Sequence, residues 1–176
     1  MSIITKIKEK LAQYKINKLR KTERKRAYVD WDKINRILLL YSINKAPEAQ
    51  SSRIYSELYE ILDKCFNEKT NVRLMVCVNK SQLEQKRFNI SVFDAKSCNA
   101  LTYQPSEDIL GITEEEDSDV VINLSPELSF PLEYIAERSD AKLKISALKT
   151  GKGAKYDMYF SSESKSVKEV FESIKY

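Results

Sequence analysis

The stretch that decides the fold runs from Asp119 to Ile145. It begins with the apolar run Asp119-Val-Val-Ile-Asn-Leu-Ser125, continues through Pro131-Leu-Glu-Tyr-Ile-Ala-Glu-Arg138 and ends in Ala141-Lys-Leu-Lys-Ile145. The first and last segments have the composition of short buried strands, and the middle one has helical spacing with proline in its first turn. A strand, a helix and a strand with short joints predict a parallel pair with a right-handed crossover.

Similar units lie before and after this stretch. Residues 36–42 and 72–78 are apolar runs typical of central strands in a parallel sheet, and the alternating residues 87–94 predict a strand near an edge. The other predicted elements are a helix from Ser51 or Ser52 to Phe66, a helical turn at 80–86, an irregular acidic stretch at 95–118, a last strand at 156–160 and a terminal helix capped by Ser164 or Ser166. The sequence therefore predicts a three-layer, Rossmann-like α/β fold with a mostly parallel sheet.

The first 26 residues differ in charge from the rest of the chain. They carry ten basic side chains against two acidic ones, a net charge of +8, whereas the remaining residues carry 20 basic and 24 acidic side chains. Apolar residues recur at every third or fourth position and no glycine or proline intervenes, which predicts one helix over residues 2–26. We therefore divide the chain into a basic amphipathic helical arm at 1–28 and a single Rossmann-like domain at 29–176.

Several uses of this arm remain open from the sequence. Its apolar residues Ile3, Ile7, Leu11 and Tyr14 either pack on the domain or meet a protein partner or a second copy. Its charge suits the phosphates of RNA or the ribosome, or an anionic membrane surface. The candidate anion-binding residues are Lys6, Lys8, Lys10, Lys15, Lys18, Arg20, Lys21, Arg24, Lys25 and Arg26.

Several kinds of chemistry lack the residues that they need. The chain has no histidine and its three cysteines lie far apart, so a histidine base is excluded and a metal site is not expected. No glycine-rich turn follows the first strand, so we expect no nucleotide cofactor and lean against an enzyme. Isolated cysteines without a secretory signal favour a cytoplasmic protein, and no apolar run is long enough to cross a membrane.

The carboxyl ends of the predicted strands are where a parallel sheet binds ligands. The polar residues Asn44, Asn123, Ser125 and Glu127 follow strands and define a candidate ligand rim. This rim is the basis of a second hypothesis, a small-ligand-binding or degenerate transferase-like protein. One carboxylate without a partner does not indicate acid–base chemistry, so no catalytic residue is assigned.

The quoted stretch resembles an uncharacterised family of small Bacteroidota proteins. The similarity covers most of the chain and rests on Asp119-Val-Val-Ile-Asn-Leu124 and on the segment from Phe130 to Ile145. Members often carry glycine where this chain has Ser146. The same unit is faintly similar to the acceptor-side half of heptosyltransferase-like glycosyltransferases, a likeness that implies a fold and supplies no catalytic residues.

These patterns favour a binding or adaptor protein over an enzyme. The basic helix is expected to dock on a polyanion, with the ribosome or another RNA as the first choice. The alternatives are the ligand rim and an arm that binds a membrane surface or a partner helix.

Overall fold

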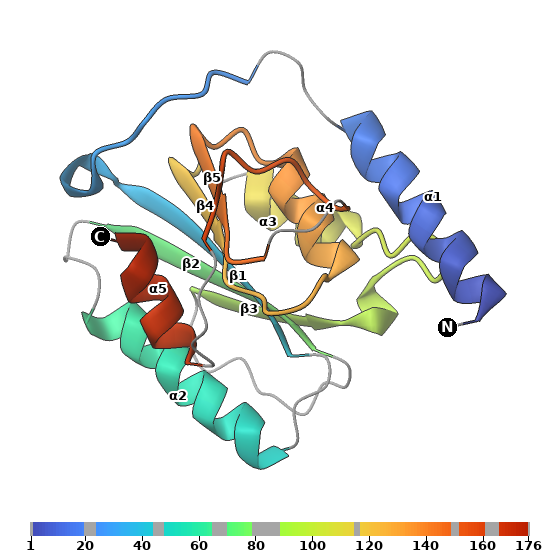
Figure 1. Ribbon diagram of the computed structural model, residues 1–176, viewed down its shortest axis with the longest axis horizontal. Helices are drawn as coiled ribbons and strands as arrows, with labels where there is room; N and C mark the ends of the chain where they lie inside the picture. The colour runs from blue at the N-terminus through green and yellow to red at the C-terminus, as the bar shows by residue number, and fades with distance from the viewer. Residues whose placement is uncertain are drawn as a thin grey trace.

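A six-stranded sheet forms the centre of the protein in the computed structural model, which describes residues 2–19, 24–43, 48–64, 70–78, 89–114, 117–148, 152–160 and 166–175. The strand order is β3-β2-β1-β4-β5-β6, and all neighbouring pairs are parallel (Figure 1). The strands are β1 (Arg36–Ile43), β2 (Asn71–Val78), β3 (Ile90–Asp94), β4 (Val120–Asn123), β5 (Leu143–Ser146) and β6 (Met158–Tyr159). The prediction of a Rossmann-like α/β sheet is confirmed, and β3 lies at an edge as expected.

Helices cover both faces of the sheet and complete the three layers (Figure 1). One face carries α2 (Glu48–Lys64) and α5 (Val167–Lys175), and the other carries α3 (Glu107–Glu114) and α4 (Phe130–Arg138). Side chains of β1 alternate between these faces, since Leu39 and Tyr41 belong to the core under α2 and α5 whereas Leu38 and Leu40 belong to the core under α4. Burial on both faces explains the nearly continuous apolar runs of β1 and β2.

A further helix, α1 (Ile3–Leu19), lies on the outer side of α4 (Figure 1). Ala12 and Ile16 are fully buried there, in a cluster with Phe130 and Tyr134 of α4. The opposite side of α4 packs on the sheet. α4 is therefore enclosed between the sheet and α1, and seven of its nine residues are buried.

The prediction of one helix over residues 2–26 is wrong, because α1 ends at Leu19 and residues 24–30 contain no helix. Here the chain makes contacts that a continued helix could not reach. The Arg24 side chain donates a hydrogen bond to the carbonyl oxygen of Ala141 at 2.6 Å. The backbone N–H of Ala27 donates to the carbonyl oxygen of Lys142 at 3.2 Å. The end of the basic segment thus lies against the β4–β5 unit instead of projecting from it.

Other boundaries also differ from the sequence prediction. α2 begins at Glu48, ahead of the serines expected to cap it, and the strand expected at 156–160 shortens to β6. Of the strand expected at 87–94, residues 87 and 88 lie outside the described residues and β3 covers Ile90–Asp94. The stretch 95–118 contains α3, in which Leu110 is buried and the acidic first turn suits the positive end of the helix dipole. Two short 3₁₀ helices occur, η1 (Trp31–Lys33) and η2 (Ala95–Ser97). The helical turn predicted at 80–86 lies outside the described residues.

Asp119 joins the amino ends of the central strands. Its carboxylate accepts hydrogen bonds from the N–H groups of Asn35 and Arg36 at 3.1 and 3.2 Å and from Lys142 Nζ at 2.9 Å. Burial alone would raise its pKa, but these donors hold the pKa of Asp119 below its usual value. The first residue of the fold-deciding stretch therefore fixes where β1, β4 and β5 begin relative to one another.

Replacing Ile16 by alanine tests the packing of α1. Ile16 has no exposed surface, so its truncation leaves a cavity beside α4 and should lower the free energy of unfolding by about 2–4 kcal/mol. Ile7→Ala, on an exposed face of the same helix, should change it by less than about 0.5 kcal/mol. Denaturant unfolding measures both, and equal losses in the two variants would contradict this packing.

Candidate functional site

The residues of the predicted ligand rim differ in their burial and contacts. Asn123 is buried, and its side-chain N–H groups donate to Glu133 Oε1 at 3.0 Å and to the Tyr156 hydroxyl at 2.9 Å. Its side-chain oxygen accepts the N–H of Ser125 at 3.0 Å. Asn123 is thus engaged within the protein. Of the other rim residues, Ser125 is buried, Glu127 is exposed and Asn44 lies outside the described residues.

Glu133 of α4 is a buried acid that sequence reasoning missed. It is 4% exposed, and its Oε2 accepts the N–H of Ala154 at 2.7 Å. Burial raises the pKa of Glu133 to about 7, although the hydrogen bonds from Ala154 and Tyr156 act to lower it. No sequence signal for this burial is evident, because Glu133 and Glu137 lie four residues apart on one face of α4, a spacing typical of a solvent-exposed side.

Gly153 allows the chain to pass close to this carboxyl group. Its φ is +90°, and a β-carbon there would lie 2.7 Å from the Glu133 carboxyl carbon. The Gly153 N–H donates to Gln13 Oε1 at 2.6 Å, and its carbonyl oxygen accepts from Gln13 Nε2 at 3.1 Å. With the ion pair between Lys152 and Glu9 at 2.9 Å, the segment 152–154 connects the buried acid of α4 to α1.

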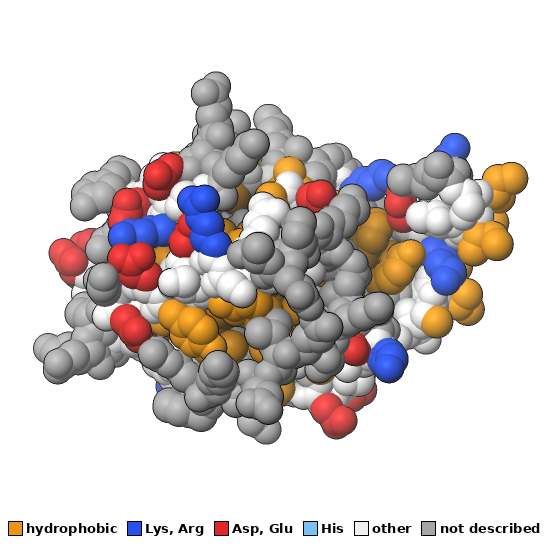
Figure 2. Space-filling view, turned by 90° about the horizontal axis from the view of Figure 1, so that it is seen from below, with side chains coloured by type: hydrophobic (Ala, Val, Ile, Leu, Met, Phe, Trp, Pro, Cys, Tyr) orange, Lys and Arg blue, Asp and Glu red, His pale blue; other side chains and the backbone are white. Residues whose placement is uncertain are grey.

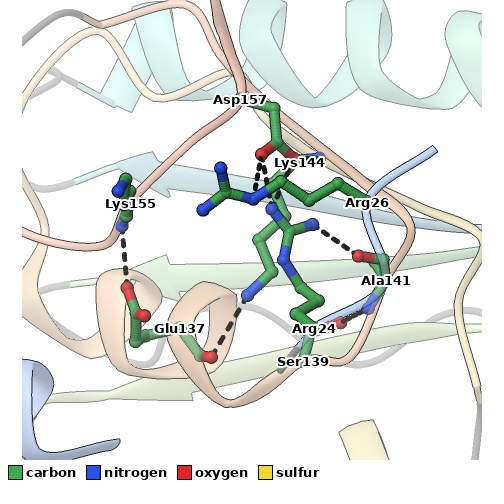
Figure 3. Close-up of polar contacts among 8 residues, drawn as sticks. All are labelled: Arg24, Arg26, Glu137, Ser139, Ala141, Lys144, Lys155 and Asp157. Atoms are coloured by element: carbon green, nitrogen blue, oxygen red, sulfur yellow. Dashed lines mark hydrogen bonds and ion pairs between the residues drawn. The ribbon is translucent and has the colours of Figure 1, made fainter. Parts of the chain in front are cut away.

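A group of charged residues lies at the other end of α4 (Figure 3). Arg24 donates to the carboxylate of Asp157 at 2.6 Å, and Arg26 Nε lies 3.3 Å from the same carboxylate. Lys144 of β5 is buried, and its Nζ donates to the carbonyl oxygen of Glu137 at 3.1 Å. Since Glu137 lies in the last turn of α4, this cation caps the negative end of the helix dipole.

This cluster of charged residues has a structural role, and only a small cavity lies beside it. Burial lowers the pKa of Lys144 to about 8, while the charge of Glu137 acts in the opposite direction. The cavity beside Lys144, Arg24 and Lys155 has a volume of about 20 Å³, enough for a water molecule and too small for a substrate. The contacts therefore hold the 24–26 segment and β5 against α4.

A larger hollow of about 370 Å³ lies between residues 96–99 and 104–107, beside the start of α3. Cys98 lines it, and burial raises the pKa of this thiol to about 11. The thiol is therefore protonated at neutral pH, which does not favour a nucleophile there. The other residues that line this hollow are mostly polar and lie in the loops around it.

The outer face of α1 carries five apolar side chains in solvent. Ile3, Ile4, Ile7, Leu11 and Tyr14 are 77%, 67%, 52%, 40% and 59% exposed, and we call this set the α1 stripe. The hypothesis that the stripe packs on the domain is therefore wrong, because the helix uses its Ala12 and Ile16 face for that contact. Figure 2 shows apolar and basic side chains next to each other at the end of the molecule where α1 lies.

The candidate anion-binding residues have different surroundings. Lys6, Lys10, Lys15 and Lys18 are exposed and Lys8 is half-buried, and Lys18 Nζ lies 5.7 Å from the centre of the Tyr14 ring. The remaining candidates are Lys25 and Arg26, which are exposed, Arg24, which is bound to Asp157, and Arg20 and Lys21, which lie outside the described residues. Lysines thus accompany the α1 stripe along the helix.

Within the described ranges, no helix is long and apolar enough to span a bilayer. The same residues contain no cluster of three or more acidic or cysteine side chains that could hold a metal ion. The distinctive surface feature of the described chain is the outer face of α1.

The fold and this surface define a Rossmann-like α/β protein with an accessory N-terminal helix that presents an apolar and basic face. The chain belongs to the family of unknown function DUF6913, which matches residues 8–176. The expectation of an uncharacterised domain family is thereby confirmed. No curated protein and no solved structure matches the chain.

Glu133→Gln tests the buried acid. Folding raises the pKa of Glu133 from 4.5 to about 7, so the fold favours the protonated form and loses stability as the group ionises. Relative to E133Q, the native protein should lose up to about 3 kcal/mol of unfolding free energy as the pH rises from 4.5 to about 7, and no more above that.

The exposed Glu127 provides the control, because Glu127→Gln removes a carboxyl group that is not buried. Unfolding curves in a common buffer series measure the difference. A constant gap between E133Q and the native protein from acid to neutral pH would contradict the raised pKa of Glu133.

Proposed function

We propose that this protein is a binding protein that docks on an anionic membrane surface through the outer face of α1. The observation that supports this proposal best is the α1 stripe, which lies in solvent although the helix is packed on the body through another face. Soluble proteins rarely expose contiguous apolar patches that have no partner. A bilayer interface accepts such a helix with its apolar face at the boundary between headgroups and acyl chains.

The charge of α1 favours an anionic surface. The helix contains five lysines and one glutamate, a net charge of +4, and the glutamate is paired with Lys152. With about 3.6 residues per turn, Lys6 and Lys10 border one side of the stripe, and Lys8 and Lys15 border the other. Each lysine near an anionic leaflet contributes about 1 kcal/mol, and its aliphatic stem covers apolar surface while the ammonium group reaches the headgroups.

The packing of α1 on the domain supports its role as a binding surface that is already in place. Ala12 and Ile16 hold one side of the helix against α4, and Gln13 makes two hydrogen bonds to Gly153. The helix therefore need not fold or detach before the stripe meets a surface. This avoids the ordering cost that a disordered arm would incur on binding.

The other uses considered from the sequence explain less of this face. Docking on RNA or the ribosome accounts for the lysines and leaves the apolar residues between them without a role. Association with a second copy accounts for the stripe, but it brings together two sets of lysines that repel each other. Binding of a partner protein would require a partner with an apolar and acidic groove, and it predicts no binding to lipid vesicles.

We place this docking on the cytoplasmic side of a membrane, where the leaflet carries anionic lipids. The presence of free thiols at Cys77 and Cys98 agrees with a reducing compartment. Kinship with small Bacteroidota proteins and with heptosyltransferase-like glycosyltransferases stays a proposal about the origin of the fold, and it assigns no activity to this chain.

Sedimentation with lipid vesicles tests the proposal. The full chain should bind vesicles that contain phosphatidylserine or phosphatidylglycerol and should not bind pure phosphatidylcholine vesicles, and added salt should weaken binding. The double variant Ile3→Gln/Ile7→Gln should bind at least about tenfold more weakly, because two exposed apolar side chains no longer enter the interface.

Met158→Gln is the control, since Met158 is 38% exposed and lies in β6, at the edge of the sheet, and not on α1. It should bind anionic vesicles like the native protein. Absence of vesicle binding, or equal binding of the double variant, would refute membrane docking. Salt-sensitive sedimentation with ribosomes in the absence of vesicle binding would favour the RNA hypothesis instead.

A further inference from the structure

The strand order places a second candidate site at the carboxyl ends of β1 and β4. From these two neighbouring strands the chain turns to opposite sides, since α2 follows β1 on one face of the sheet and α4 follows β4 on the other. In doubly wound sheets, ligands bind in the crevice at this switch point. The sequence offered only isolated polar residues at this edge, and the structure shows which of them lie together.

Small polar side chains line this edge on the side of α4. Ser42 follows Leu38 and Leu40 in the alternation of β1, and it lies opposite Cys77 of β2 in the strand register. On the other side, Leu40 pairs with Asn123, and the N–H of Leu124 donates to the carbonyl oxygen of Leu40 at 2.9 Å. Ser125 is the next residue after Leu124 in the chain. Ser42 therefore lies one residue before the end of β1, and Ser125 lies two residues beyond the end of the neighbouring strand β4.

The hydroxyl groups of these two serines are buried without a hydrogen-bond partner in the described structure. Ser42 is 6% exposed and Ser125 is 1% exposed. A buried hydroxyl that lacks a partner costs stability, so such groups need an explanation. The Ser129 hydroxyl, just before α4, likewise has no partner. At the opposite end of α4 and on β5 the buried serines are bonded, since Ser139 Oγ accepts the N–H of Ala141 and Ser146 Oγ bonds to the backbone of Leu148.

The amino end of α4 faces the same edge. Ser129 occupies its N-cap position but makes no capping hydrogen bond with its side chain. Burial raises the pKa of Cys77 to about 12 and the nearby Ser129 hydroxyl acts to lower it, which places the start of α4 against β2. The uncapped N–H groups and the positive end of the helix dipole are thus directed toward the ends of the central strands.

We infer that this edge is a binding site for an anion, and specifically for the phosphate group of a small phosphorylated ligand. Ser42 and Ser125 would donate their hydroxyl protons to phosphate oxygens. The first turn of α4 would add the backbone N–H groups of Phe130 and Leu132, because Pro131 between them has none. Glu133, the acid of α4 nearest this end, is turned toward Asn123 and Ala154. This site is separate from the α1 stripe and does not depend on membrane docking.

Inorganic phosphate is the probe that tests this site. Thermal unfolding of the full chain in increasing phosphate, at constant ionic strength, should show a rise in Tm that saturates. Ser42→Ala and Ser125→Ala should each weaken the apparent Kd roughly tenfold, because each removes one hydrogen bond to a charged ligand. Neither variant should unfold the protein, because each removes a buried hydroxyl that has no partner.

Ser139→Ala is the matched control, since it removes a buried serine hydroxyl at the opposite end of α4. It should keep the apparent Kd of the native protein. The proposal is overturned if phosphate leaves the Tm of the native protein unchanged. It is equally overturned if all three variants keep the native Kd, since phosphate would then be bound elsewhere, for example by the lysines of α1.

Discussion

The burial of α4 on both of its sides is the constraint on which the rest of the structure depends. Leu132, Ile135 and Ala136 belong to the core against the sheet, and Phe130 and Tyr134 belong to the cluster with α1. A helix enclosed in this way cannot leave its polar side chains to water. The two buried acids, Glu133 and Glu137, need partners inside the protein, because a buried charged or polar group without one costs stability.

The segment after β5 supplies those partners. Backbone N–H groups of Ala154 and Lys155 donate to Glu133 and Glu137, each at 2.7 Å. Gly153 is required for this approach because a side chain there would overlap Glu133. The same segment bonds to Gln13, so the satisfaction of the buried acids also determines where α1 is held.

Because α1 is held against α4 by Ala12 and Ile16, the apolar residues of the α1 stripe are left outside. Ala12 permits close approach to α4, and the bulkier Ile3, Ile4 and Ile7 face solvent among lysines. The amino end of α4 is directed toward the carboxyl ends of β1 and β4, where two serine hydroxyls lack partners. One enclosed helix thus positions both surfaces for which we propose a function, and the two surfaces are chemically different.

The sequence alone determined the scaffold, and the tertiary structure decided the use of its parts. Apolar runs of strand length and the β-α-β pattern from Asp119 to Ile145 are local signals, so the parallel sheet and α4 could be predicted. The buried role of Glu133 could not, since it depends on Ala154, which lies 21 residues further along the chain. That of Lys144 could not either, since it depends on how β5 packs against the end of α4. Periodicity likewise showed that α1 is amphipathic, but it could not decide which face of the helix meets the domain. Ala12 and Ile16 form the contact because they complement the surface of α4, and shape complementarity between distant segments is set by packing and not by hydrophobicity along one helix.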